Sequence, residues 1–310
     1  MCAARTALAA ITAGVNGDRR IGRERVGDDG RVNAEKTDIV VHRSGLDEGP
    51  DLLLVHGLTD SSGGWGQAVA HWGRSYRVTT LDLRGHGESP RFTEAELQGH
   101  PGDLMVEDVV GVVGRLDRPV VIGHSLGGAI ALAVGADHPE LVRALVLEDP
   151  APRGPEEPQR LPERGRQYLD ELAPSRAASD DDELVAVRRE QHPGWPEEEL
   201  LSTGRAEQQI QDDYLLGGDW KPTEPWTELL GRLTVPTLLV TGDVLDEVVV
   251  SPEMEEGMRA ASPSLEVRRL EGAGHCVRRD RQDVFYAVVD EWLGITADAA
   301  GSGPPRPDRS

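Results

Sequence analysis

One stretch of the chain, residues 120–128, constrains its fold more than any other. It reads VVIGHSLGG, three β-branched apolar residues followed by a Gly-x-Ser-x-Gly pattern, and small apolar residues continue from it to Ala136. The β-branched run favours a strand, the small apolar run favours a buried helix, and the serine lies where one gives way to the other. Glycine on either side of this serine, Ser125, allows a turn too tight for a Cβ atom. We therefore predict a strand, a sharp turn and a helix, with Ser125 presented at the turn.

Around this stretch, apolar strand-like runs alternate with helical patterns along most of the 310 residues. Such alternation predicts a mostly parallel sheet covered by helices on both faces. In sheets of this kind the functional side chains gather at the carboxyl ends of the strands, where the loops converge. Strands are predicted at residues 39–42, 52–56, 78–82, 119–122, 144–147, 237–240 and 265–270. Helices are predicted at residues 104–116, 128–136, 252–261 and 282–293.

Three further motifs accompany the Gly-x-Ser-x-Gly turn. Residues 51–58 read as a buried strand ending in His-Gly, residues 78–89 as a strand followed by a polar Gly-rich turn, and residues 272–275 are Gly-Ala-Gly-His. In this order the four motifs resemble the α/β-hydrolase family, over residues 39–293. The resemblance implies the α/β-hydrolase fold, a mostly parallel central sheet flanked by helices, with an inserted helical cap. It is more specific for the fold than for the substrate.

Residues 151–230 interrupt the alternation of strands and helices. The segment is rich in Pro, Glu and Arg and has helical stretches at 184–191 and 197–209. Its acidic run at 179–183 is expected to begin a helix, because acids suit the N-terminal dipole. Members of the family commonly carry a helical cap at this place, so we expect a lid that shapes specificity and does no chemistry. Three tryptophans of this segment either line a pocket or pack the lid onto the body: Trp195, Trp220 and Trp226.

The remaining boundaries follow from composition. Residues 1–35 are rich in Gly, Arg and Asp without clear periodicity, and we expect a loose N-terminal arm. Residues 297–310 are rich in Gly, Pro, Ser, Asp and Arg and are expected to form a disordered tail. The α/β core then comprises residues 36–150 and 231–296, with the cap between the two parts.

The resemblance also implies candidate catalytic groups. A serine hydroxyl is a poor nucleophile and needs an adjacent base. His275 follows the last strand and precedes the last helix, where the family places its catalytic histidine. An oxyanion hole needs two N–H donors, each worth roughly 3–4 kcal/mol to the transition state. The backbone amides of Leu58 and Leu126 are the expected donors to the oxyanion formed when Ser125 attacks.

The acid that orients the histidine is the open member of the set. Most relatives carry it after the seventh strand, in the pattern Gly-x-x-Asp, but the residue three positions after Gly242 is Leu245. Some relatives use an acid after the sixth strand instead, and Asp149 stands just past the end of that strand here. We favour Asp149, with Asp246 as the alternative. Two further candidates are Asp243 and Glu148.

Composition narrows the partners and the location. The formal net charge of −22 argues against nucleic acid and anionic membrane surfaces as partners. No apolar run approaches the length of a membrane span, and two cysteines are too few for a disulfide framework, so we expect a cytoplasmic protein. Cys276 is expected to be a small filler beside the histidine loop, and His56 and His86 to brace backbone loops. The motifs imply no metal or organic cofactor and leave the oligomeric state open.

The sequence therefore predicts a serine hydrolase of carboxylesterase type that cleaves a small-molecule ester through an acyl-enzyme. Serine at the turn argues against epoxide hydrolase or haloalkane dehalogenase chemistry, for which the family uses aspartate there. Hydrolysis of lactones or of C–C bonds in diketo acids, and lyase or perhydrolase reactions, would use the same groups and are alternatives. A ligand receptor or binding protein that keeps the pocket without turnover is the alternative from another class.

Overall fold

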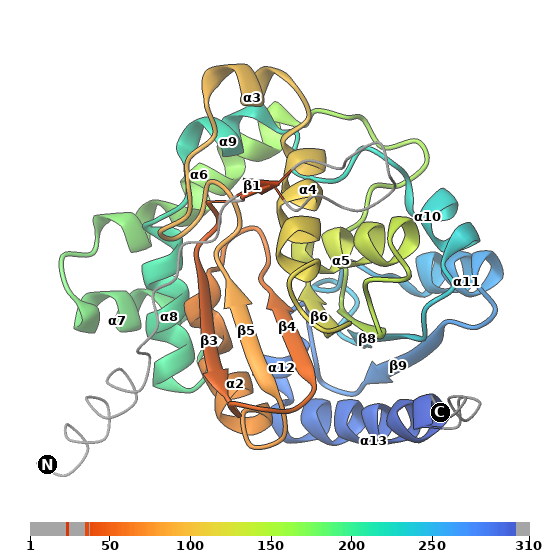
Figure 1. Ribbon diagram of the computed structural model, residues 1–310. Helices are drawn as coiled ribbons and strands as arrows, with labels where there is room; N and C mark the ends of the chain where they lie inside the picture. The colour runs from red at the N-terminus through yellow and green to blue at the C-terminus, as the bar shows by residue number, and fades with distance from the viewer. Residues whose placement is uncertain (1–22, 25–34, 37, 302–310) are drawn as a thin grey trace, which may run out of the picture.

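A seven-stranded sheet forms the centre of the protein. The computed structural model describes residues 23–24, 35–36 and 38–301, so most of the predicted N-terminal arm and residues 302–310 of the predicted tail lie outside the described residues. The strand order is β3-β5-β4-β6-β7-β8-β9, in which β3 is antiparallel to β5 and the other pairs are parallel (Figure 1). This confirms the predicted mostly parallel sheet. The strands are β3 (Val41–Gly45), β4 (Asp51–Val55), β5 (Arg77–Leu81), β6 (Val120–His124), β7 (Ala144–Glu148), β8 (Thr237–Gly242) and β9 (Glu266–Leu270).

Alternate residues of each strand point to opposite sides of the sheet, and helices cover both sides, so both faces are buried. Leu53 and Val55 of β4 belong to the hydrophobic cluster that includes residues of α4, α5, α10 and α11, whereas Leu52 and Leu54 belong to the cluster with α2, α12 and α13. The helices of the first face are α4 (Pro101–Val113), α5 (Leu126–Asp137), α10 (Trp226–Arg232) and α11 (Pro252–Ala261). Those of the second are α2 (Gly66–Trp72), α12 (Val277–Asp280) and α13 (Gln282–Gly301).

The predicted lid segment contains four helices that follow β7. They are α6 (Pro162–Ala177), α7 (Asp181–Gln191), α8 (Glu197–Glu207) and α9 (Asp212–Gly217), and they contact one another (Figure 1). The lid touches the body where α8 meets the 3-10 helix η1 (Ser62–Trp65) and where α9 meets α3 (Glu94–Gln98). The predicted acidic helix start is present, because the Asp180 side chain caps α7 by accepting from the amide of Glu183 at 2.9 Å.

Two predicted boundaries differ from the structure. Helix α10 begins at Trp226 and packs against α5 and α11 of the body, so the predicted end of the lid near residue 230 falls inside a body helix. Helix α13 continues to Gly301, past the predicted start of the tail at residue 297. The strands β1 (Arg23–Glu24) and β2 (Glu35–Lys36) pair antiparallel in a separate sheet. Within the described residues, no helix combines the length and the apolar character that a membrane span requires.

Candidate active site

Ser125 lies at the turn between β6 and α5, as the motif predicts. Its backbone has φ +53° and ψ −116°, a conformation that a residue with a Cβ rarely adopts. The glycines beside it are needed for close packing, because a Cβ on Gly127 would collide with the carbonyl oxygens of Val55 and His56, and one on Gly123 would collide with Gly127. Strain of this kind, about 1–3 kcal/mol per residue, is typical of functional sites. The turn therefore presents Ser125 at the carboxyl end of the central strand.

His275 lies in the loop between β9 and α12, with Asp149 against its ring. Its Nδ1 is 2.5 Å from Oδ2 of Asp149, which is fully buried at the end of β7. The other contacts of this carboxylate come from the neighbouring strand and loop: Oδ1 accepts from Thr241 Oγ1 at 2.7 Å and from the amide of Val250 at 3.1 Å, and Oδ2 from the amide of Val249 at 2.8 Å. A carboxylate held by three other donors cannot rotate freely. It therefore fixes the orientation of the imidazole.

The other candidate acids lie elsewhere in the described part of the chain. Asp246 is exposed in the loop between β8 and α11. Asp243 accepts a hydrogen bond from the amide of Gly272 at 2.7 Å. Glu148 is buried and faces Arg278, whose amide and Nη1 donate to its two oxygens at 2.8 and 3.0 Å. Of the four candidates, the structure brings only Asp149 to the histidine.

His124, the residue before Ser125 in the turn between β6 and α5, contacts the loop that carries His275. Its Nε2 lies 3.1 Å from the carbonyl oxygen of His275, so this nitrogen is the donor, and the two rings are 4.8 Å apart between centroids. Burial, and then the nearby His275, hold the pKa of His124 well below its ordinary value. A neutral ring with its proton on Nε2 follows. The sequence analysis assigned no role to His124, although its place inside the Gly-x-Ser-x-Gly motif puts it next to Ser125.

Two buried histidines brace the loop that carries Leu58. His56 accepts from the amide of Leu83 at 2.9 Å through Nε2, so its Nδ1 donates to the carbonyl of Gly57 at 2.8 Å. His86 Nε2 lies 2.7 Å from the carbonyl oxygen of Leu58 itself. Burial, and then His56, lower the pKa of His86 to about 4, so its ring is neutral at physiological pH. These contacts match the predicted bracing of backbone loops.

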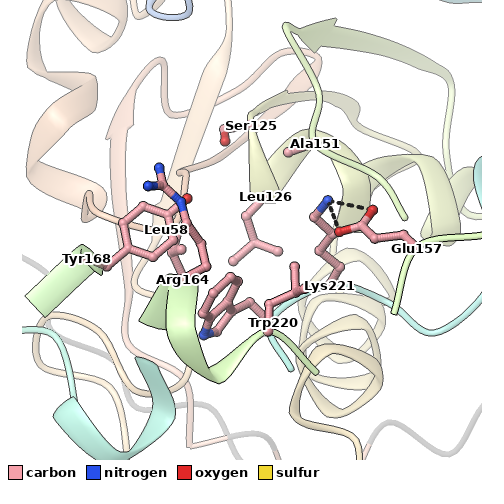
Figure 2. A pocket seen from close by; sticks show the side chains of 10 residues that line it. Leu58, Ser125, Leu126, Ala151, Glu157, Arg164, Tyr168, Trp220 and Lys221 are labelled. Carbon is pink, nitrogen blue, oxygen red and sulfur yellow. Dashed lines mark hydrogen bonds and ion pairs between the residues drawn. The ribbon is translucent and has the colours of Figure 1, made fainter. Parts of the chain in front are cut away.

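Ser125, Leu58 and Leu126 line one pocket with a volume of about 320 Å³ (Figure 2). The Leu126 amide is the first of α5, and the first amides of a helix have no acceptor within it. The remaining apolar lining comes from the lid side: Ala151, Leu161, Tyr168 and Trp220. Charged groups flank this apolar floor in Figure 2: Arg164 on one side, and Lys221 paired with Glu157 at 2.6 and 2.9 Å on the other. The described residues contain no cluster of His, Cys, Asp or Glu suited to a metal ion.

The three tryptophans predicted for the lid have different places. Trp220 lines the pocket and donates to the carbonyl of Leu215 at 3.1 Å. Trp195 stacks on His192 and donates to Oδ1 of Asp280 at 2.8 Å, which joins the lid to α12, the helix after the histidine loop. Trp226, in α10, packs against Gly257 of α11. One of the three therefore lines this pocket, and the other two fasten elements together.

Two buried arginines lie in α12, the helix that follows His275, and the sequence analysis did not single them out. Arg278 and Arg279 follow His275 by three and four positions and are almost fully buried. They contact the carboxylates of Asp60, Glu148 and Glu199. The sequence offered one signal for this pair: two adjacent arginines shortly after the Gly-Ala-Gly-His motif.

Cys276 lies beside these groups. Burial raises the pKa of its thiol to about 12, so the thiolate is absent at neutral pH. This agrees with the prediction of a non-catalytic filler next to His275.

Comparison with known proteins gives consistent matches. A model of the alpha/beta hydrolase family matches residues 52–288. Bifunctional epoxide hydrolase 2 of Rattus norvegicus is 26% identical over 303 residues, covering 83% of this chain and 54% of that protein, so the chain spans about half of that relative. N-formylmaleamate deformylase of Pseudomonas putida is 24% identical over 253 residues, covering 79% of this chain and 89% of that protein. The structure of naproxen esterase (carboxylesterase NP) from Bacillus subtilis superposes with a TM-score of 0.63 at 19% identity, covering 93% of this chain and 96% of that one.

Proposed function

The chain belongs to the α/β-hydrolase family, and from this premise we propose that it is a serine hydrolase that cleaves a carboxylic ester through an acyl-enzyme. Members with similar sequences include an epoxide hydrolase and a deformylase by name, so family membership supports hydrolysis but not one substrate. We do not propose epoxide hydrolysis, because the elbow position that carries aspartate in that chemistry is Ser125 here.

One observation carries the proposal: Ser125, on a strained turn, lines a pocket together with Leu58 and Leu126, and His275 is held by the fixed carboxylate of Asp149. The backbone amides of Leu58 and Leu126 are the oxyanion donors that we propose. The contact between Asp149 and His275 Nδ1 leaves Nε2 as the nitrogen that can take a proton. Nucleophile, base, orienting acid and oxyanion donors are the parts that acyl transfer requires.

In the proposed mechanism, His275 Nε2 takes the proton of Ser125 as the hydroxyl attacks the ester carbonyl. The C–O bond of the ester breaks when the tetrahedral intermediate collapses, and His275 gives its proton to the leaving alcohol. Water then attacks the acyl-enzyme by the same steps, releasing the acid and restoring Ser125. Asp149 keeps the imidazole in the required tautomer and stabilises the imidazolium, without itself taking the proton.

The two amides act on the charge that develops on the carbonyl oxygen. A donor of this kind contributes about 3–4 kcal/mol to the transition state because it is already oriented. The loop that carries the Leu58 amide is held by His56 and His86, and the Leu126 amide is held by the helix it begins. Both donors therefore lie on rigid elements, and lid residues such as Trp220 shape the acyl pocket.

Turnover of p-nitrophenyl esters by the wild-type chain and by Ser125→Ala tests this proposal. We expect hydrolysis by the wild type and a loss of about 10³-fold or more in kcat in the variant. Ser264→Ala, at an exposed turn after α11, is the matched control and should retain full activity. Binding of an ester without turnover by the wild type would favour a ligand-binding protein instead. Near-native turnover by folded Ser125→Ala would show that Ser125 is not the nucleophile.

A further inference from the structure

We propose that Arg279 is a positioning residue that couples the seating of lid helix α8 to the geometry of the oxyanion hole. The inference rests on the proposed function, because it concerns the amide of Leu58 as an oxyanion donor. It is carried by one buried guanidinium that contacts both Glu199 of α8 and Asp60 of the loop that begins with His56.

The contacts of Arg279 are short and enclosed. Its Nε donates to Oε2 of Glu199 at 2.6 Å, and its Nη2 donates to Oδ2 of Asp60 at 2.9 Å. The side chains of Arg279, Asp60 and Glu199 are 3%, 4% and 7% exposed. Charge-assisted hydrogen bonds are strong and directional when water is excluded. A movement of α8 that takes Glu199 with it therefore changes the forces on Asp60.

Asp60 in turn shapes the turn that aims the Leu58 amide. The amide of Asp60 donates to the carbonyl of Gly57 at 3.3 Å, which closes a tight turn around Leu58. The Asp60 carboxylate also accepts from the amide of Ser61 at 2.9 Å, which fixes the chain as it leaves the turn. An oxyanion donor acts only when its N–H lies about 2.7–3.1 Å from the developing charge. A small displacement of Asp60 therefore alters catalysis without any contact to substrate.

Arg278 ties the same carboxylate to the strand that carries the acid. Its Nη2 donates to Oδ2 of Asp60 at 3.2 Å, while its Nη1 and its amide bind Glu148, the residue before Asp149. The three carboxylates Asp60, Glu148 and Glu199 thus share two guanidiniums from α12, the helix that follows His275. Burial raises the pKa of Asp60, but Arg279 and Arg278 outweigh it and lower the pKa to about 2, so the group is ionised.

A second contact joins the same end of the lid to the histidine loop. Asp280 accepts from Trp195 Nε1 at 2.8 Å and from the amide of Gly274, which precedes His275, at 2.9 Å. The guanidinium of Arg279 also lies over the Trp195 ring, 5.0 Å from its centroid. The turn before α8 therefore rests on two consecutive residues, Arg279 and Asp280. When the lid packs in this position, its contacts with Arg279 and Asp280 hold both the loop that carries Leu58 and the loop that carries His275.

Glu199→Gln tests the coupling, because it keeps the shape and a hydrogen-bond acceptor but removes the charge that Arg279 shares. Glu198→Gln is the matched control, since Glu198 is exposed on the same helix and its carboxylate accepts a hydrogen bond from Gln67 at 3.3 Å, away from Arg279. The measurements are kcat and KM for a p-nitrophenyl ester, the rate of Ser125 labelling by a fluorophosphonate, and the thermal midpoint. We expect Glu199→Gln to lower both kcat and the labelling rate by about tenfold with KM within about twofold, because misplacement of about 1 Å costs up to about 10²-fold. Glu198→Gln should change neither.

Arg279→Lys is the second variant. It keeps the positive charge but lacks the planar fork needed to hold Asp60 and Glu199 together. We expect the same loss in kcat with KM preserved. If both folded variants change only the thermal midpoint, Arg279 merely anchors the lid and the inference is wrong. A wild-type protein that is not labelled at Ser125 would instead overturn the proposed function, so the two failures are distinguishable.

Discussion

Asp149 and His275 are 126 positions apart in the chain, yet Oδ2 of the first lies 2.5 Å from Nδ1 of the second. The contact joins the end of β7 to the loop after β9, across the intervening strand β8. Thr241 of β8 and the amides of Val249 and Val250 hold the same carboxylate, so the loop after β8 serves as a support where most relatives place the acid itself.

Asp149→Asn should therefore lower kcat by about 10³–10⁴-fold, because an amide in this place no longer stabilises the imidazolium and favours the wrong tautomer. Steady-state hydrolysis of a p-nitrophenyl ester measures the loss. Asp246→Asn, in the exposed loop after β8, is the control and should retain full kcat. Equal activity of the two variants would mean that Asp149 does not orient the base.

Trp220 should govern the acyl length that the pocket accepts. Its ring lines the pocket, whereas that of Trp226 packs against Gly257 outside it. Trp220→Phe removes ring volume, so we expect kcat/KM for longer acyl esters to rise about tenfold relative to acetate, the scale of about one methylene in an apolar pocket. Trp226→Phe should leave this ratio unchanged. Labelling of Ser125 by a small fluorophosphonate should be equal in both; its loss in folded Trp220→Phe would show that the lid contributes to the chemistry.

Asp60 should contribute to acid unfolding in a defined window. Its pKa is lowered from 3.8 to about 2 in the folded state, so the ionised carboxylate stabilises the fold above pH 3.8, and the contribution is lost as the pH falls toward 2. A shift of this size in a buried group corresponds to about 2 kcal/mol. Carbon-13 titration of the aspartate carboxyls measures the pKa directly, and unfolding by urea between pH 5 and 2 measures the loss of free energy. A midpoint for Asp60 at or above 3.8 would contradict the ion pairs with Arg278 and Arg279.

Cys276 should be unreactive in the folded protein, even though it adjoins His275. Burial raises the pKa of its thiol to about 12, and only the thiolate is a good nucleophile. We expect iodoacetamide at pH 8 to leave esterase activity intact and Cys276 unmodified by peptide mass mapping, whereas urea should expose the residue to alkylation. Rapid alkylation of the native protein at Cys276 with loss of activity would indicate an accessible thiolate.

Much of the fold is predictable from the sequence because local signals and tertiary packing agree there. The apolar runs that end at Val55, Leu81 and Val240 form buried parallel strands, and each needs apolar residues on both faces. The elbow at Ser125 is predictable for the same reason, since only glycine fits where α5 approaches β4. The predicted end of the lid was wrong at α10, because the sequence of a short helix does not indicate whether it packs against a lid or against the body.

The candidate site was less predictable where it depends on contacts between distant segments. Position in the sequence left four candidate acids, and only the folded structure shows that Asp149 is the one that contacts His275. The buried pairing of Arg279 with Asp60 joins residues 219 positions apart, and no periodicity reports such a contact. Charged residues are ordinarily expected to be exposed, so the adjacent Arg278 and Arg279 were too weak a signal to predict that both side chains are buried.

The central claim, acyl transfer through Ser125, is tested most directly by trapping the intermediate. Wild-type protein mixed with excess p-nitrophenyl acetate and quenched in acid within its first turnovers should show a burst of nitrophenol and an added acetyl mass on the peptide that contains Ser125. Ser125→Ala should show neither. Continued turnover by the wild type with no acyl adduct on this peptide, or with the adduct on another residue, would contradict the account.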